Sequence, residues 1–176
     1  MPFRGIFAWA DALESSVWLR ESLNAYPILL TTHVVSMCLF AGLIAFWDLR
    51  LVGFALKRVS VTEIPTRIFP WALTGFAISM ITGLVLLYSK PLTYYENMYF
   101  WIKMGMLALA GINMMVFHFT TYKTVEAWKN EAIIPRSAQL AGVFSLVLWA
   151  GIVTTGRMMA YGGLVPEWWK ALNAAG

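Results

Sequence analysis

The stretch that decides the fold is residues 25–47, which read AYPILLTTHVVSMCLFAGLIAFW and contain no charged side chain. Three further runs have the same character: Phe69 to Ser89, Met104 to Tyr122, and Ser137 to Gly156. A helix needs roughly 20 mostly apolar residues to cross the hydrocarbon core of a bilayer, which is about 30 Å thick. The sequence therefore predicts an all-α fold, a four-helix transmembrane bundle with spans near residues 25–50, 69–89, 97–122 and 137–161.

Composition supports a single integral membrane domain over residues 1–176. The chain is 60% hydrophobic and 12% charged, whereas soluble domains contain about 25% charged residues. Four spans and their connections leave no room for a soluble catalytic domain. The net charge of +4 does not suggest nucleic acid as a partner, because the positive residues lie at helix ends and not in one patch. We expect the partners to be the lipid bilayer and either other membrane subunits or further copies of this chain.

The segment before the first span, residues 3–23, is predicted to be an amphipathic interfacial helix. Ile6, Ala10, Leu13 and Val17 recur at helical spacing, while charged residues fall on another face. Its two tryptophans suit the level of the lipid headgroups, so the helix is expected to lie on the membrane surface.

The distribution of Lys and Arg predicts the orientation. The connectors after spans one and three carry more of them (Arg50, Lys57, Arg58, Arg67, Lys123, Lys129 and Arg136) than the opposite side (Arg4, Arg20, Lys90 and Lys170, with Lys103 and Arg157 within helix ends). The positive-inside rule then places those connectors in the cytoplasm. The chain is expected in a bacterial inner (cytoplasmic) membrane, with both termini in the periplasm.

The two histidines of the chain, His33 and His118, both lie in predicted spans. Ionisable residues inside a bilayer are costly and are often functional, and haem iron accepts histidine as a ligand. His33 is two turns into span one and His118 is near the end of span three, so their depths should differ by about 15–20 Å. One haem held by both is therefore nearly excluded. Each could bind a separate metal or cofactor, or could simply hydrogen-bond to a neighbouring helix.

Other polar and aromatic residues gather at the level of His33. Arg157, Tyr161 and Trp101 are the candidates for cofactor binding there. The Arg157 guanidinium could neutralise a haem propionate, a quinone oxygen or a lipid phosphate, or it could extend to the interface with no ligand at all. Near the other face, Asp48 and Arg50 are each expected to find a partner on another helix or in the headgroups.

Two features of the spans predict helix packing. Gly75, Ser79 and Gly83 recur every four residues in span two and place small side chains on one face. Such a face permits close helix approach, although it would also accept a flat macrocycle or a quinone head. Asn113, deep in span three, is expected to form an interhelical hydrogen bond.

Copper is a weaker alternative. Thioethers and thiols bind Cu(I), and Met37 and Cys38 are near His33 along span one. The methionines do not, however, form a regular ladder on one helix face. No phosphate loop, nucleophile elbow or zinc signature occurs in the sequence, so no catalytic residue is assigned. The sequence favours a subunit over an enzyme that acts by itself.

Several short motifs resemble a bacterial family of uncharacterised four-helix membrane proteins. They are His33-x8-Gly42-x5-Asp48-Leu-Arg-Leu-Val-Gly53, Pro70-Trp-x3-Gly75-Phe, Thr82-Gly83 and Gly156-Arg-Met-Met-Ala-Tyr161. The chain is also distantly similar to copper-resistance D-type membrane proteins and to small haem-b membrane cytochromes, families with intramembrane histidines that His33 would match. It lacks two histidine pairs at matching depths, so two bis-histidine haems are not implied.

Together these features favour a redox membrane subunit in electron transport, binding haem b or quinone near the outer face. Two alternatives remain open: a non-catalytic accessory subunit of a larger membrane complex, and a copper or small-molecule permease.

Overall fold

The computed structural model describes residues 3–56, 59–128, 134–161 and 165–174. Four long helices dominate it: α3 (Ala25–Val52), α4 (Glu63–Ser89), α6 (Met98–Phe119) and α8 (Arg136–Met158). After α6 the chain continues through the 3-10 turn η1 (Tyr122–Thr124) and α7 (Val125–Trp128). All four long helices are apolar and long enough to cross a membrane. The predicted all-α fold with four membrane-spanning helices is confirmed, and the chain is a small multi-pass membrane protein.

The second long helix begins earlier than its charge-free run. It starts at Glu63, and Arg67 donates to the Glu63 carboxylate at 2.7 Å in the first turns. Pro65 is in the first turn, where a proline costs no hydrogen bond. The helix therefore begins with a charged turn ahead of its apolar part. A search for uncharged runs does not include that turn.

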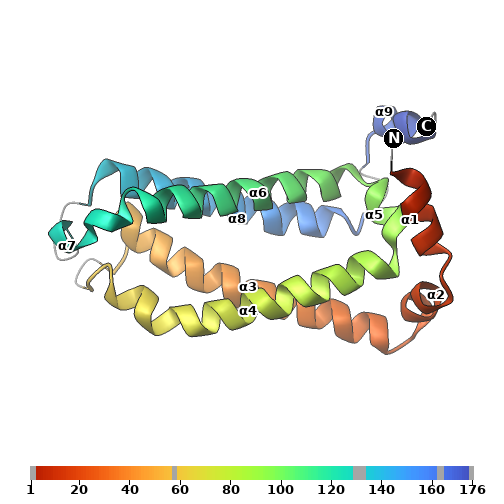
Figure 1. Cartoon of the computed structure of the whole chain (residues 1–176), viewed down its shortest axis with the longest axis horizontal. Helices are drawn as coiled ribbons and strands as arrows, with labels where there is room; N and C mark the ends of the chain where they lie inside the picture. The colour runs from red at the N-terminus through yellow and green to blue at the C-terminus, as the bar shows by residue number, and fades with distance from the viewer. Residues whose placement is uncertain (1–2, 57–58, 129–133, 162–164, 175–176) are drawn as a thin grey trace.

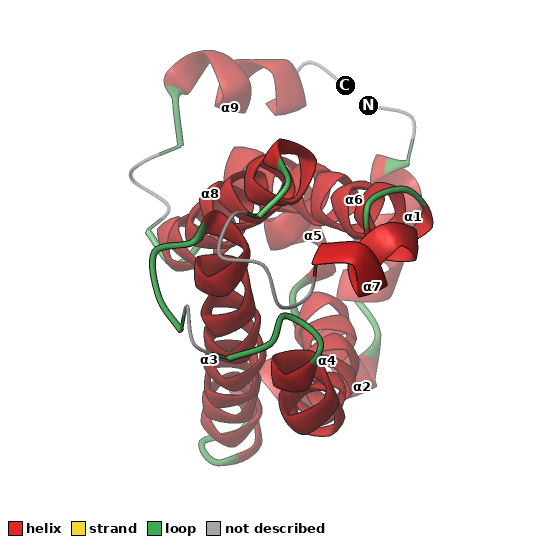
Figure 2. Ribbon diagram, turned by 90° about the vertical axis from the view of Figure 1, so that its left-hand side faces the viewer, coloured by secondary structure: helices red, strands yellow, loops and turns green. Residues whose placement is uncertain are grey.

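The long helices pack in a chain of contacts. Helix α3 packs against α4, α8 packs against α6, and α3 joins the two pairs by packing against α8. Figures 1 and 2 show the α6–α8 pair above the α3–α4 pair. The Asn113 side chain of α6 donates to the Ala141 carbonyl of α8 at 3.1 Å. The predicted interhelical hydrogen bond of Asn113 is thus confirmed.

The bundle has two unlike ends. The Asp48 end, where α3 and α6 finish, is closed by a buried apolar cluster of Leu51, Val61, Phe117, Val125, Trp128, Ile134 and Ala138. The His33 end, where α3 and α6 begin, carries the short helices α1 (Arg4–Asp11), α2 (Glu14–Glu21), α5 (Pro91–Tyr95) and α9 (Glu167–Ala174). Both the first and the last helix of the chain lie at this end in Figure 1, as an even number of spans requires.

The amino-terminal segment forms two helices, where the sequence predicts one. Helix α1 ends at Asp11, and the extended backbone of Leu13 turns the chain into α2. The Arg20 guanidinium donates to both the carbonyl and the carboxylate of Asp11 and so holds the elbow. Ser16 of α2 is buried and donates to the Ser89 carbonyl at the end of α4. Tertiary hydrogen bonds at the end of α4 thus fix a bend that local periodicity does not reveal.

The expected interfacial character of this segment agrees with its exposed aromatic residues. The side chains of Trp9 and Trp18, one on each helix, are each 66% exposed. Both helices lie at the end of the bundle, as Figure 1 shows. This is the position in which tryptophan can lie at the headgroup level.

Candidate functional site

The contact between α3 and α4 is built on the small-residue face of α4. A Cβ atom at Gly75 would lie 3.0 Å from the Ser36 carbonyl oxygen and 3.2 Å from the Phe40 nitrogen of α3. A Cβ atom at Gly83 would lie 3.0 Å from Cε1 of the His33 ring. Helix packing is therefore confirmed as the role of this face, and the His33 ring packs against Gly83 at its far end.

The His33 ring is oriented by α4. Its Nδ1 atom lies 3.0 Å from the Ser79 carbonyl oxygen and 3.1 Å from Thr82 Oγ1. A backbone carbonyl can only accept, so the proton of a neutral ring must be on Nδ1. The Thr82 hydroxyl donates its own proton to the Ile78 carbonyl, at 2.7 Å, and is free to accept from His33. Nε2 is left with an available lone pair, and it has no hydrogen-bond partner among the described residues.

Lys103 of α6 is a cation whose charge acts on the His33 ring. Its positive charge acts electrostatically on His33, although the two residues belong to different helix pairs. Its ammonium also lies 3.5 Å from the position that a Cβ atom would take at Gly156 of α8. No salt bridge to Lys103 is formed within the described part of the chain. Lys103 therefore brings a positive charge from α6 into the electrostatic environment of His33.

The other residues predicted for this level lie at the same end but do not contact His33. Arg157 donates to the Tyr161 hydroxyl at 2.9 Å, and its guanidinium lies 5.1 Å from the centre of the Tyr161 ring. Both side chains are exposed. The Trp101 indole donates to the Tyr95 carbonyl at 2.9 Å. The structure therefore brings Arg157 and Tyr161 together on the surface, whereas Lys103 is a cation that acts electrostatically on His33.

A tyrosine pair adds polar groups at this end. Burial and a hydrogen bond with Tyr26 raise the pKa of Tyr94 in α5 above its ordinary value. The Lys90 ammonium lies 4.3 Å from the centre of the Tyr26 ring. Tyr94 therefore stays a neutral phenol at physiological pH, able to donate one hydrogen bond.

His118 occupies the opposite end of the bundle. It is exposed in the last turn of α6 and stacks on Tyr122, with ring centres 5.7 Å apart and planes at 19°. Helices α3 and α6 run in the same direction in Figure 1, so the beginning of one and the end of the other are far apart. The predicted separation of the two histidines in depth agrees with this placement. A ligand at His118 would be bound at the surface and independently of His33.

The described residues do not assemble a metal site of protein ligands alone. Among them, no group of three or more His, Cys, Asp or Glu side chains could hold a metal ion. Cys38 is exposed, whereas its neighbour Met37 is buried, so the two sulfur atoms do not face the same side of α3. The described His, Cys, Asp and Glu side chains thus supply no clustered donor set for copper.

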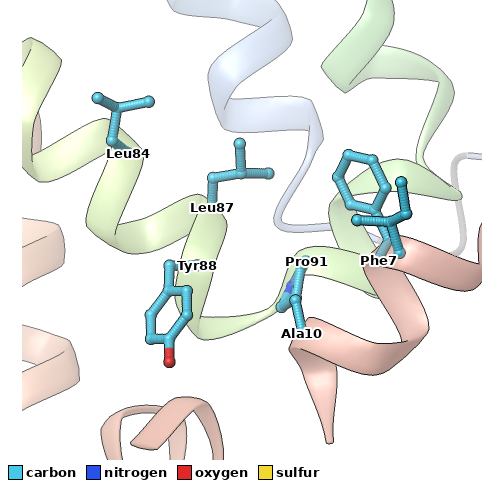
Figure 3. A pocket seen from close by; sticks show the side chains of 7 residues that line it. Phe7, Ala10, Leu84, Leu87, Tyr88 and Pro91 are labelled. Carbon is cyan, nitrogen blue, oxygen red and sulfur yellow. The ribbon is translucent and has the colours of Figure 1, made fainter. Parts of the chain in front are cut away.

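An apolar groove lies between α1 and α4, with a volume of about 220 Å³. Figure 3 shows Leu84, Leu87 and Tyr88 of α4 on one side and Phe7 and Ala10 of α1 on the other. A second cavity of about 260 Å³ is lined by Pro27, Ile28, Thr31 and Thr32. His33 lines neither of them. Almost no polar groups line the groove, so it resembles a lipid-facing surface.

Sequence reasoning placed His33 and Lys103 at one level but missed the groups of α4 that orient the histidine ring. Lys103 carried a recognisable signal, since it is a charge just inside an otherwise uncharged span. Thr82 carried little, because a threonine in an apolar helix usually bonds to its own backbone. Only the rotation of α4 against α3 shows that Ser79 and Thr82 point at the histidine.

Comparison with known proteins gives the family of the chain and no function. No curated protein and no solved structure matches the chain. One family profile, described as a family of unknown function (DUF6644), matches residues 25–162, from the start of α3 to just beyond α8. It covers all four long helices, including His33, Asp48 and Lys103. This chain therefore belongs to DUF6644, an uncharacterised family of which it is a four-span member.

Proposed function

We propose that this protein is a redox membrane subunit that holds a haem b or a quinone headgroup at His33. One observation carries the proposal: the bond from Nδ1–H to the Ser79 carbonyl leaves Nε2 as a free acceptor. Metal-ligating histidines almost always donate their other ring nitrogen to a carbonyl or carboxylate in this way. The same tautomer accepts a hydrogen bond from a hydroxyl group.

The residues around His33 fit either ligand in part. Haem b would take Nε2 as one axial ligand, and the cations at this end, Lys103 and Arg157, suit its propionates. When bound, haem would supply one-electron transfer. A quinone carbonyl would accept from the Lys103 ammonium, and a quinol hydroxyl would donate to Nε2. His118 is at the other end, so a second axial ligand from this chain would have to be a different residue.

The site is proposed to face the periplasm in the inner membrane. The connectors that carry the excess of Lys and Arg, after α3 and after α6, are at the Asp48 end. By the positive-inside rule that end is cytoplasmic. The His33 end, with α1 and α9, would then be the outer one.

The test uses the full-length protein purified from membranes in mild detergent. The measurements are the visible absorption spectrum and the quinone content of a solvent extract, for the wild type, His33→Ala and the matched control His118→Ala. We expect a Soret band or bound quinone in the wild type, its loss in His33→Ala, and its retention in His118→Ala. A band identifies haem, and quinone without a band identifies the other ligand. Loss in His118→Ala alone would move the site to the opposite end.

A Lys103→Gln variant separates ligand binding from folding. It removes the charge with little change in size, so the helical circular dichroism should be unchanged while ligand retention falls. Wild-type protein that contains neither haem nor quinone, even after incubation with each, would overturn the redox proposal.

A second candidate function is a non-catalytic subunit of a larger complex. It is favoured by the outer faces of α4 and α6, which expose Leu73, Ile81, Leu84, Leu109, Ile112 and Met115. Each of these helices packs extensively on only one other long helix, α4 on α3 and α6 on α8, and they do not pack extensively on each other. Stable co-purification of another membrane protein, unaffected by His33→Ala, would support this role.

A further inference from the structure

Asp48 lies in the most tightly closed part of the bundle. It is four residues before the end of α3, where the helix crosses α8. A Cβ atom at Gly142 of α8 would lie 3.1 Å from both the Asp48 carbonyl oxygen and Leu51 Cβ, so the two helices are in close contact here. The Asp48 residue is only 3% exposed. The carboxyl group is thus enclosed by protein at the edge of the membrane.

The carboxyl group has one polar neighbour, Ser145 of α8, and one unused oxygen. Its Oδ2 atom is buried and has no hydrogen-bond partner among the described residues. An ionised carboxylate normally accepts several hydrogen bonds from its surroundings. This environment offers too few donors for that form.

No cation of the described residues neutralises Asp48. Arg50, on the same helix, is 2% exposed and donates from Nε to the Val59 carbonyl at 2.8 Å. On α4, Arg67 is paired with Glu63 and exposed. Tyr122 is half-buried, and the remaining charged or titratable groups described at this end are exposed: His118 of α6, Lys123 and Glu126 after it, and Arg136 of α8. Asp48 forms no salt bridge within the described segments.

The electrostatic cost of burial decides whether the Asp48 carboxyl group is ionised or neutral. Burying an unpaired charge is far more costly than burying a neutral acid, and such a group neutralises itself by binding a proton. The neutral acid needs only one donor and one acceptor contact, which a serine hydroxyl can supply in either direction. Inside membranes, isolated acidic residues of this kind mark sites of function.

We propose that Asp48 is a proton-binding site, held as the neutral acid by the closed α3–α8 contact. When the contact opens, the acid O–H bond breaks, the proton passes to water from the adjacent aqueous phase, and the carboxylate remains. When it closes, the carboxylate takes a proton back. The ligand is a proton, and the site is independent of the redox ligand proposed at His33.

The amino-acid composition allows a sharp test, because the chain has only two aspartates, Asp11 and Asp48. Asp11 is at the opposite end and forms a salt bridge with Arg20 at 3.1 Å. The full-length protein, labelled with ¹³C at the aspartate carboxyl, is reconstituted in vesicles and studied by infrared spectroscopy at neutral pH. We expect one isotope-sensitive band of a protonated acid in the wild type and in Asp11→Asn. The band should be absent from Asp48→Asn.

Ser145→Ala provides the second readout. Removal of this neighbouring hydroxyl should shift the Asp48 acid band without removing it, while Gln139→Ala, on the same helix, should leave the band unchanged. Two results would overturn the proposal: an aspartate signal made up only of carboxylate bands at neutral pH in folded protein, or an acid band that disappears on addition of Na⁺ at constant pH. The latter would indicate a cation site.

Discussion

The two ends of the bundle both place polar side chains inside a membrane protein, but they surround these side chains in opposite ways. At the Asp48 end, α3 crosses α8 closely and a cluster of apolar side chains covers the crossing. At the His33 end, α3 packs on α4, and the neighbouring cation comes from the separate α6–α8 pair. Among the described residues, the closed end thus leaves one oxygen of a buried acid without a hydrogen bond, whereas the His33 end leaves a ring nitrogen available. This difference is the basis for proposing a proton at one end and a larger ligand at the other.

The largest effect is expected from breaking the closed end. Gly142→Leu places a side chain against the Asp48 carbonyl and Leu51 Cβ, both 3.1 Å from the new Cβ. Neither can move without shifting α3, so the free energy of unfolding should fall by about 3 kcal/mol, the upper range for overpacking. Thermal unfolding in detergent, followed by circular dichroism, measures it.

Gly42→Leu is the matched control for this change. Gly42 is an exposed position of α3, and a Cβ atom added there would meet no atom within 4 Å. The control should be neutral or stabilising, because leucine favours helix over glycine by somewhat under about 1 kcal/mol. Equal melting temperatures for the two variants would show that the α3–α8 contact is not close.

A smaller effect should distinguish two glycines within the α3–α4 contact. Gly75→Ala meets the backbone of α3 at 3.0 Å and should destabilise the protein by about 1–2 kcal/mol. Gly83→Ala meets the His33 ring, which can rotate, so its stability should change by less than about 1 kcal/mol. Rotation would break the bond to Ser79, however, and reduce retention of any ligand at Nε2. Unfolding curves and ligand content are measured together.

Gly105→Ala on the exposed face of α6 serves as the reference for helix propensity, since a Cβ there meets no atom within 4 Å. If Gly83→Ala proved as destabilising as Gly75→Ala while keeping its ligand, the His33 ring would be a rigid packing element and not a ligand-binding group.

The smallest effect is expected at Arg157. The Arg157–Tyr161 hydrogen bond and ring contact are exposed, so Arg157→Lys should change stability by less than about 1 kcal/mol. Lysine keeps the charge but loses the planar fork. If the guanidinium binds an anionic group of the ligand, retention should fall partly with lysine and further with leucine. Arg136→Lys, an exposed change at the Asp48 end, is the control, and unchanged ligand content in all variants would remove Arg157 from the site.

Much of the fold could be predicted because the bilayer imposes it. A charge-free run such as residues 25–47 has few structures available in lipid, where every backbone group must be bonded within its own segment. The small face at Gly75, Ser79 and Gly83 and the bond of Asn113 followed from the same reasoning. The elbow between α1 and α2 could not be predicted in this way. It depends on hydrogen bonds from Arg20 to Asp11 and from Ser16 to the Ser89 carbonyl.

The sequence by itself determined that this chain has four membrane-spanning helices, and that His33 lies two turns inside one of them, because hydrophobicity and length are local properties. Only the tertiary structure decided what His33 and Asp48 face. The rotation of α4 about its axis brings the Ser79 carbonyl to one ring nitrogen. The crossing of α3 and α8 at Gly142 seals the carboxyl group beside Ser145. Helix rotation and crossing are set by packing between segments far apart in the chain, and no single segment encodes them.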